Sequence, residues 1–220
     1  MLKSIVKRRV AVLVACVLLA GCGSADPVAY RGIASSAQLQ PNPHDDSGRV
    51  PFRYSTQVNW RTYTKIIVDP VTVYRGPDHQ FDDMSEADKT TLADYMRSQF
   101  SEKLATRFQV TNDPGPDTLR LKLTLTGAVA TTQVVGTFTH LDLAGNLYNG
   151  VQAVRGREGM VAGSVVYAVE IYDSASSRLL SAYVSKQYPG AMNIGASFGS
   201  LAAAKTGLEK GAEALTEQFK

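Results

Sequence analysis

The chain has 220 residues, of which 23 are Lys or Arg and 20 are Asp or Glu, giving a formal net charge of +3. Four of the basic residues lie within residues 1–21, which carry no acidic residue, so residues 22–220 hold 19 basic against 20 acidic side chains. This near-neutral balance excludes the broad basic field with which proteins attract nucleic acid by charge alone.

The N-terminus has the organisation of a bacterial lipoprotein signal. A positively charged stretch contains Lys3, Lys7, Arg8 and Arg9. Residues 10–20 are then almost wholly apolar, in a run too short to span a bilayer as a helix. The run closes on Leu19-Ala20-Gly21-Cys22, which resembles the lipobox, where the cysteine is diacylated on sulfur and becomes the first residue after cleavage. We therefore expect residues 1–21 to be a signal peptide and Cys22 to be lipidated.

Neither of the two cysteines is expected to remain as a thiol in the mature chain. Cys16 lies in the segment that would be removed and Cys22 carries lipid, so the mature chain keeps no thiol for a disulfide, a metal site or a nucleophile. Gly23 follows Cys22, whereas an aspartate at that position is typical of inner-membrane retention. We expect a protein anchored by lipid to the outer membrane and facing the periplasm.

Residues 22–50 are rich in Ser, Pro, Gly, Asn and Asp and show little apolar periodicity. Such a composition predicts a flexible tether behind the lipid. His44 belongs to this segment and is expected to be solvated. The remaining residues, 51–220, are predicted to form a single α+β periplasmic domain.

The first half of this domain begins with β-branched residues at 63–74, which Asp69-Pro70 divides into one bent strand or two short ones. The polar residues 75–84 include several carboxylates and His79, but their spacing fits no metal-ligand pattern, so we expect a solvated loop. Ser85 and Asp88 then resemble a capping box, which predicts a helix over residues 86–108.

The second half alternates apolar and polar residues in the manner of strands. Leucines recur at every second position from Leu119 to Leu125, and further strands are predicted at 161–172 and 179–187. Glu170 is expected to be an exposed strand carboxylate. A closing helix at 200–219 completes the pattern. The order of elements predicts an α+β fold, a two-layer sandwich with a mainly antiparallel sheet and two long helices packed on one face.

Residues 131–162 are glycine-rich yet unusually apolar for a connection. One interpretation is that a short helix at 143–154 covers the sheet. The other is that the segment presents apolar side chains to a partner or a membrane surface. The candidate interaction residues are Phe138, Leu141, Leu143, Leu147, Tyr148 and Val151.

Three segments, together with the lipobox and the polar region behind it, resemble a known family. They are YxKIIVDPV at 63–71, VEIYD at 169–173 and RLLSA at 178–182. All are similar to the proteobacterial lipoproteins grouped as the domain of unknown function DUF3313. The resemblance covers nearly the whole chain and implies an envelope lipoprotein with no established catalytic residues.

The sequence offers little support for catalysis, because it combines no cysteine in the mature chain with three scattered histidines and no Gly-x-Ser-x-Gly elbow. We expect a non-catalytic envelope lipoprotein that requires no cofactor or metal and binds a protein partner, another copy of itself or peptidoglycan. The alternative is a carrier of lipid or of another small apolar ligand.

Overall fold

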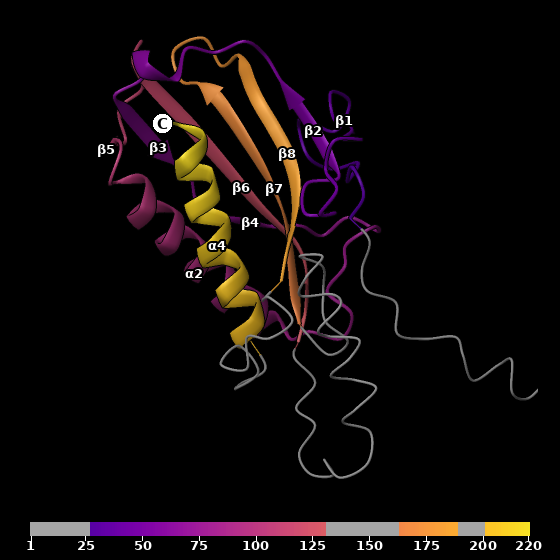
Figure 1. Ribbon diagram of the computed structural model, residues 1–220. Coiled ribbons are helices and arrows are strands. Elements are labelled where there is room, and N and C mark those ends of the chain that lie inside the picture. Colours follow the sequence, from indigo (N-terminus) through magenta and orange to yellow (C-terminus); the bar gives the residue numbers. More distant parts are fainter. Residues whose placement is uncertain (1–26, 131–162, 189–200) are drawn as a thin grey trace, which may run out of the picture.

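The computed structural model describes residues 27–130, 163–188 and 201–220, which form an open mixed sheet of eight strands with two long helices (Figure 1). The predicted α+β class is confirmed. Cys22 and the candidate interaction residues Phe138, Leu141, Leu143, Leu147, Tyr148 and Val151 lie outside the described residues, as does the helix predicted at 143–154.

Five strands pair antiparallel in the order β1, β2, β8, β7, β6. Their bounds are β1 Gln40–Pro41, β2 Phe52–Ser55, β8 Leu179–Gln187, β7 Ser164–Asp173 and β6 Thr118–Val129. The register places Leu123 of β6 opposite Val169 of β7, and Val169 opposite Tyr183 of β8. These three long strands carry the centre of the sheet.

Three short strands join the other edge in parallel. They are β3 (Lys65–Val68) and β4 (Thr72–Val73), which both pair with β6, and β5 (Gln109–Val110), which pairs with β3. Two short strands were one of the two predicted outcomes at Asp69-Pro70. Parallel pairing of β3 with β6 requires a crossover connection, and helix α2 lies within that connection.

Helix α2 spans Glu86–Leu104 and begins where the capping box predicted, since the Ser85 Oγ accepts a hydrogen bond from the Asp88 N–H at 3.1 Å. The helix ends four residues before the predicted Phe108, because the chain turns at Ala105 to enter β5. Phe108 nevertheless remains buried.

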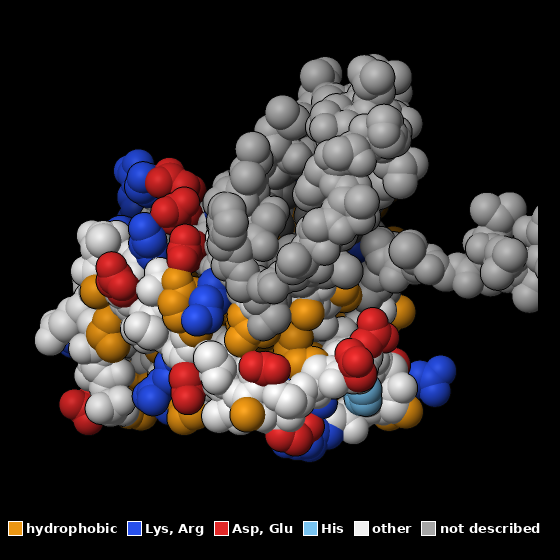
Figure 2. Space-filling model, turned by 90° about the horizontal axis from the view of Figure 1, so that it is seen from below, with side chains coloured by type: hydrophobic (Ala, Val, Ile, Leu, Met, Phe, Trp, Pro, Cys, Tyr) orange, Lys and Arg blue, Asp and Glu red, His pale blue; other side chains and the backbone are white. Residues whose placement is uncertain are grey.

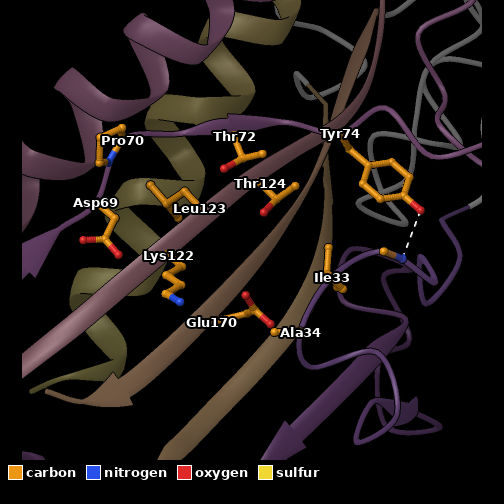
Figure 3. A pocket seen from close by; sticks show the side chains of 11 residues that line it. Ile33, Ala34, Asp69, Pro70, Thr72, Tyr74, Lys122, Leu123, Thr124 and Glu170 are labelled. Atoms are coloured by element: carbon orange, nitrogen blue, oxygen red, sulfur yellow. Dashed lines mark hydrogen bonds between the residues drawn. The ribbon is translucent and has the colours of Figure 1, made fainter. Parts of the chain in front are cut away.

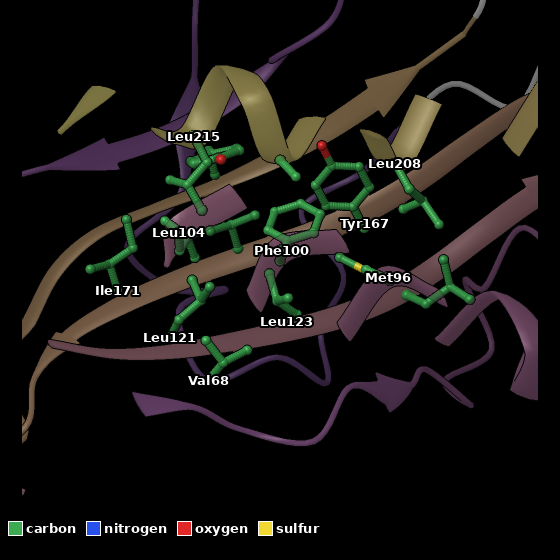
Figure 4. Packing of buried hydrophobic residues seen from close by; sticks show 14 of the residues in the cluster. Val68, Met96, Phe100, Leu104, Leu121, Leu123, Tyr167, Ile171, Leu208 and Leu215 are labelled. Carbon is green, nitrogen blue, oxygen red and sulfur yellow. The ribbon is translucent and has the colours of Figure 1, made fainter. Parts of the chain in front are cut away.

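Helix α4 spans Ala202–Gln218 and contacts α2, β7 and β8. Both helices contribute to one hydrophobic cluster with the leucines of β6, as the alternation in the sequence predicted (Figure 4). Phe100 of α2 meets Tyr167 of β7 edge to face, with ring centroids 5.7 Å apart. Such a contact adds a preferred geometry to the apolar burial.

Glycines allow α4 to approach the sheet closely. A Cβ atom at Gly211 would lie 1.8 Å from the Tyr167 hydroxyl oxygen, and one at Gly207 would lie 2.9 Å from the Val165 Cγ1. These positions cannot accept a side chain without movement of the neighbouring strand residues. The one-turn spacing of the two glycines thus places both on the side of α4 that faces β7.

The opposite side of the sheet, which we call the outer face, carries a second hydrophobic cluster. Its buried members are Tyr30, Ile33, Leu39, Tyr74, Val166, Ala168, Ala182 and Val184. Residues 29–39, which we call the strap, lie across this face. The structure therefore differs from the tether predicted for residues 22–50, because in its described part, residues 27–50, Tyr30, Ile33 and Leu39 are buried against the domain.

The physical reason is that β7 is apolar on both faces. Val165 and Tyr167 point to the helices, whereas Val166 and Ala168 point to the outer face, and all four are at most 1% exposed. Burial of apolar surface favours a covering segment there. The strap supplies it with Tyr30, Ile33 and Leu39, residues spaced too irregularly to indicate a helix or a strand.

Candidate functional site

A cavity of about 410 Å³ opens on the outer face, between the strap and the strands β6 and β7 (Figure 3). The strap contributes Gly32, Ile33 and Ala34, and the turn between β3 and β4 contributes Asp69 and Pro70. The strands contribute Thr72, Lys122, Leu123, Thr124 and Glu170, and Tyr74 directly follows β4. We call this space the outer-face cavity.

Tyr74 holds the strap beside the cavity. Its hydroxyl donates a hydrogen bond to the Asp78 Oδ1 at 2.6 Å and accepts one from the Gly32 N–H at 3.1 Å. The Arg31 N–H also donates to the Asp78 carboxylate. A Cβ atom at Gly76 would lie 2.0 Å from the Tyr74 hydroxyl oxygen, so this approach requires glycine. The strap is thus fixed by polar contacts as well as by apolar burial.

The environment of these groups shifts their pKa values. Burial, followed by the hydrogen bond to Asp78, raises the pKa of Tyr74. Burial alone would raise the pKa of Asp78, but hydrogen bonds from the Tyr74 hydroxyl and the Arg31 N–H lower it below its ordinary value. Burial raises the pKa of the neighbouring Tyr30 to about 12. Both tyrosines therefore stay protonated and Asp78 ionised at neutral pH.

Tyr30 completes the attachment of the strap. Its ring meets that of Tyr74 edge to face at 5.4 Å, and its hydroxyl donates to the Gln80 Oε1 at 2.7 Å. The side chain is only 1% exposed. Tyr30 follows the predicted lipidated cysteine by eight residues, so a residue buried in the domain lies close in sequence to the predicted anchor.

Glu170 is the residue that sequence reasoning placed wrongly. It was expected to be exposed, but only 4% of its surface is accessible, and its Oε1 accepts a hydrogen bond from the Ser35 N–H at 2.6 Å. The strap covers it, since Ser35 is itself buried. One signal was available, because the neighbouring residues Val166 and Ala168 make the same face of the strand apolar.

Lys122 lies directly opposite Glu170 in the register of β6 and β7. It is exposed, and its Nζ lies 5.1 Å from the centroid of the Tyr172 ring. Asp69, on the far side of the cavity, pairs with Arg120 at 3.6 Å. The outer-face cavity therefore combines a buried carboxylate, an exposed ammonium group and the hydroxyls of two threonines.

A second hollow, of about 450 Å³, lies where α2 begins and is lined in part by Asp82, Asp83, Met84 and Asp88. It borders Ala130 and Leu201, which are adjacent in sequence to residues outside the described part of the chain. Seen from below, this end of the molecule intersperses acidic and basic side chains, with hydrophobic ones among them (Figure 2).

Over residues 27–130, 163–188 and 201–220, no three His, Cys, Asp or Glu side chains come together in a way that would hold a metal ion. Within the same ranges, no helix combines the length and apolar character needed to cross a bilayer.

Several solved structures are distantly similar to this chain. The PelC dodecamer from Paraburkholderia phytofirmans matches with a TM-score of 0.39 and 8% identity, over 73% of this chain and 94% of that one. A Xanthomonas campestris protein of the family DUF330 matches with a TM-score of 0.34 and 10% identity, over 81% and 88% of the two chains. Likenesses this weak support no inference about function.

No curated protein matches the chain. A family model, by contrast, matches residues 29–215, a range that begins within the strap and ends in α4. It therefore includes every strand of the sheet and the whole lining of the outer-face cavity. The chain belongs to DUF3313, a family of proteins of unknown function.

Proposed function

We propose that the protein is a non-catalytic lipoprotein of the cell envelope, held at the outer membrane by lipid on Cys22 and facing the periplasm. Its α+β domain, with the two long helices on one face of the sheet, binds a protein partner or a second copy of itself. The predicted contact segment is residues 138–151.

The observation that carries this proposal is the short spacing between the predicted lipid and the folded domain. Tyr30, which is buried, follows Cys22 by eight residues. Fully extended, these eight steps of the chain reach at most about 29 Å, because each residue spans no more than about 3.6 Å. A domain attached in this way stays near the bilayer surface, where partners in the same membrane are within reach.

The alternative function, a carrier of lipid or another apolar ligand, has less support. The outer-face cavity is lined by Asp69, Lys122 and Glu170 together with threonine hydroxyls. An apolar ligand would remove water from the exposed Lys122 ammonium group without pairing it, which is unfavourable. The carrier therefore ranks second.

The anchor is tested by fractionating cells that express the intact chain or the Cys22→Ser variant. We expect the intact protein in the outer-membrane fraction and a folded but unanchored Cys22→Ser protein, because the acyl chains provide the membrane affinity. A Cys22→Ser protein that stays in the membrane fraction would contradict the anchor.

Partner binding is tested separately, by photo-crosslinking the intact lipoprotein in its own envelope. A photoreactive residue replaces Tyr148 in the predicted contact segment, and a matched control replaces Lys210, an exposed residue of α4. We expect a defined partner or a self-crosslinked ladder from position 148 that position 210 does not give. Lipid that co-purifies with the protein, without either product, would favour the carrier.

A further inference from the structure

The outer-face cavity is lined by two oppositely charged side chains that no close ion pair joins. Lys122 and Glu170 are directly opposed on neighbouring strands, and Figure 3 shows both projecting from the same side of the sheet. No ion pair within 4.0 Å joins these two described residues. Glu170 therefore lines the cavity as a buried carboxylate without Lys122 as a close cationic partner.

Glu170 is buried, whereas Lys122 is exposed. The Ser35 N–H donates a hydrogen bond to one oxygen of the buried carboxylate, and the Tyr172 hydroxyl also donates to Glu170. A buried carboxylate is stabilised further by a cation or another donor. Lys122 is exposed and has only the face of the Tyr172 ring beside its Nζ. The cavity thus presents a buried, hydrogen-bonded anion and an exposed cation.

The other polar groups around the cavity already have partners. Asp69 is paired with Arg120, and the Tyr74 hydroxyl both donates to Asp78 and accepts from the Gly32 N–H. The hydroxyls of Thr72 and Thr124 complete the lining. A ligand therefore encounters one negative group, one positive group and neutral hydroxyls.

We propose that the outer-face cavity binds a small zwitterion of the α-amino acid type, with its ammonium group on Glu170 and its carboxylate on Lys122. The cavity volume of about 410 Å³ lies within the range of small-molecule sites. Charge-assisted hydrogen bonds at both ends give the site its selectivity, because a ligand with one charge leaves the other protein charge unpaired. This activity goes beyond the proposed function and does not depend on lipid or on a protein partner.

The test is calorimetric titration of the full-length lipoprotein in detergent micelles with alanine, phosphoethanolamine, acetate and methylamine. We expect saturable binding of a zwitterion and none of acetate or methylamine at the same concentration. Tighter binding of alanine indicates that the ligand is a free amino acid. Tighter binding of phosphoethanolamine indicates that the ligand is a lipid headgroup that carries the same pair of charges. Binding of neither zwitterion overturns the proposal.

Variants locate the site. Lys122→Met removes the exposed cation and is expected to weaken zwitterion binding roughly 10- to 100-fold, the loss of one charge-assisted hydrogen bond. The control Lys210→Met removes an exposed lysine of α4, away from the cavity, and is expected to bind as the parent does. Equal affinity in all three proteins overturns the proposal, and since both substitutions lie at exposed positions, unfolding does not confuse the result. Crosslinking to a protein partner is unaffected by this outcome, so the two proposals fail independently.

Discussion

Replacement of Gly211 by alanine tests how closely α4 packs on the sheet. The new Cβ atom would lie 1.8 Å from the Tyr167 hydroxyl oxygen, whereas real Cβ contacts stay beyond 3.0 Å. The helix or the ring must therefore move by about 1.2 Å. Tyr167 has little room to move, because it is 1% exposed and its ring packs edge to face on Phe100.

The expected magnitude comes from two opposing effects. Forcing extra volume into a packed core costs about 1–3 kcal/mol, and the rigid surroundings of Tyr167 place this site at the upper end. Alanine improves the helix propensity by about 1 kcal/mol over glycine. The net effect is a loss of about 2 kcal/mol in the free energy of unfolding. For a domain of this size, the loss lowers the Tm by about 4–8 °C.

The assay is urea unfolding followed by circular dichroism, with Gly211→Ala measured in the parent and in a Tyr167→Phe background. Phenylalanine removes the oxygen at 1.8 Å and leaves the ring carbon Cζ at 2.9 Å, so most of the clash disappears. We expect a coupling free energy of at least about 1 kcal/mol between the two positions.

Two results would refute this reasoning. A Gly211→Ala protein that is more stable than the parent would mean that helix propensity decides the outcome and that α4 sits farther from β7. An equal loss of stability in both backgrounds would mean that the Tyr167 hydroxyl is not the obstacle.

Three other predictions concern the core, the cap and the strap. Leu123→Asp places a charge in the layer between β6 and the helices and is expected to unfold the domain, since an unpaired buried charge costs several kcal/mol; an unchanged melting curve would contradict the face assigned to Leu123. Ser85→Ala removes the hydrogen bond to the Asp88 N–H and should lower the free energy of unfolding by about 1 kcal/mol. Ser85→Asn keeps a residue that caps helices well and should retain most of that stability. Asp78 has a lowered pKa in the folded protein, so its contribution to stability is complete above its unfolded pKa near 3.8 and is lost as the pH falls below that value. The protection of the backbone amides of residues 29–39, measured by hydrogen exchange relative to the intrinsic rate at each pH, should therefore fall on acidification in the parent but not in Asp78→Asn; the same fall in both proteins would exclude Asp78 as the cause.

The sequence alone predicted those features that depend on local order. Alternating leucines in 119–125 correctly indicated a strand with one face in the core, and Ser85 with Asp88 correctly indicated the start of α2. The residues that make up each signal lie within a few positions of one another. The periodicity of a strand and the geometry of a cap therefore need no distant partner. The family resemblance, which rests on short contiguous segments of sequence, was also confirmed.

Only the tertiary structure decided what lies on the outer face. The burial of Glu170 depends on Ser35, which is 135 residues away in sequence, and the strap that carries Ser35 has too few apolar residues to indicate an element of its own. The short strands β1, β2 and β5 likewise exist through their pairing with longer neighbours. A segment with weak local preference takes the structure that its contacts impose, because apolar burial against a preformed sheet outweighs local propensity. The residues expected to lie in a free tether therefore became one wall of the cavity, beside a carboxylate whose surroundings no stretch of adjacent residues encodes.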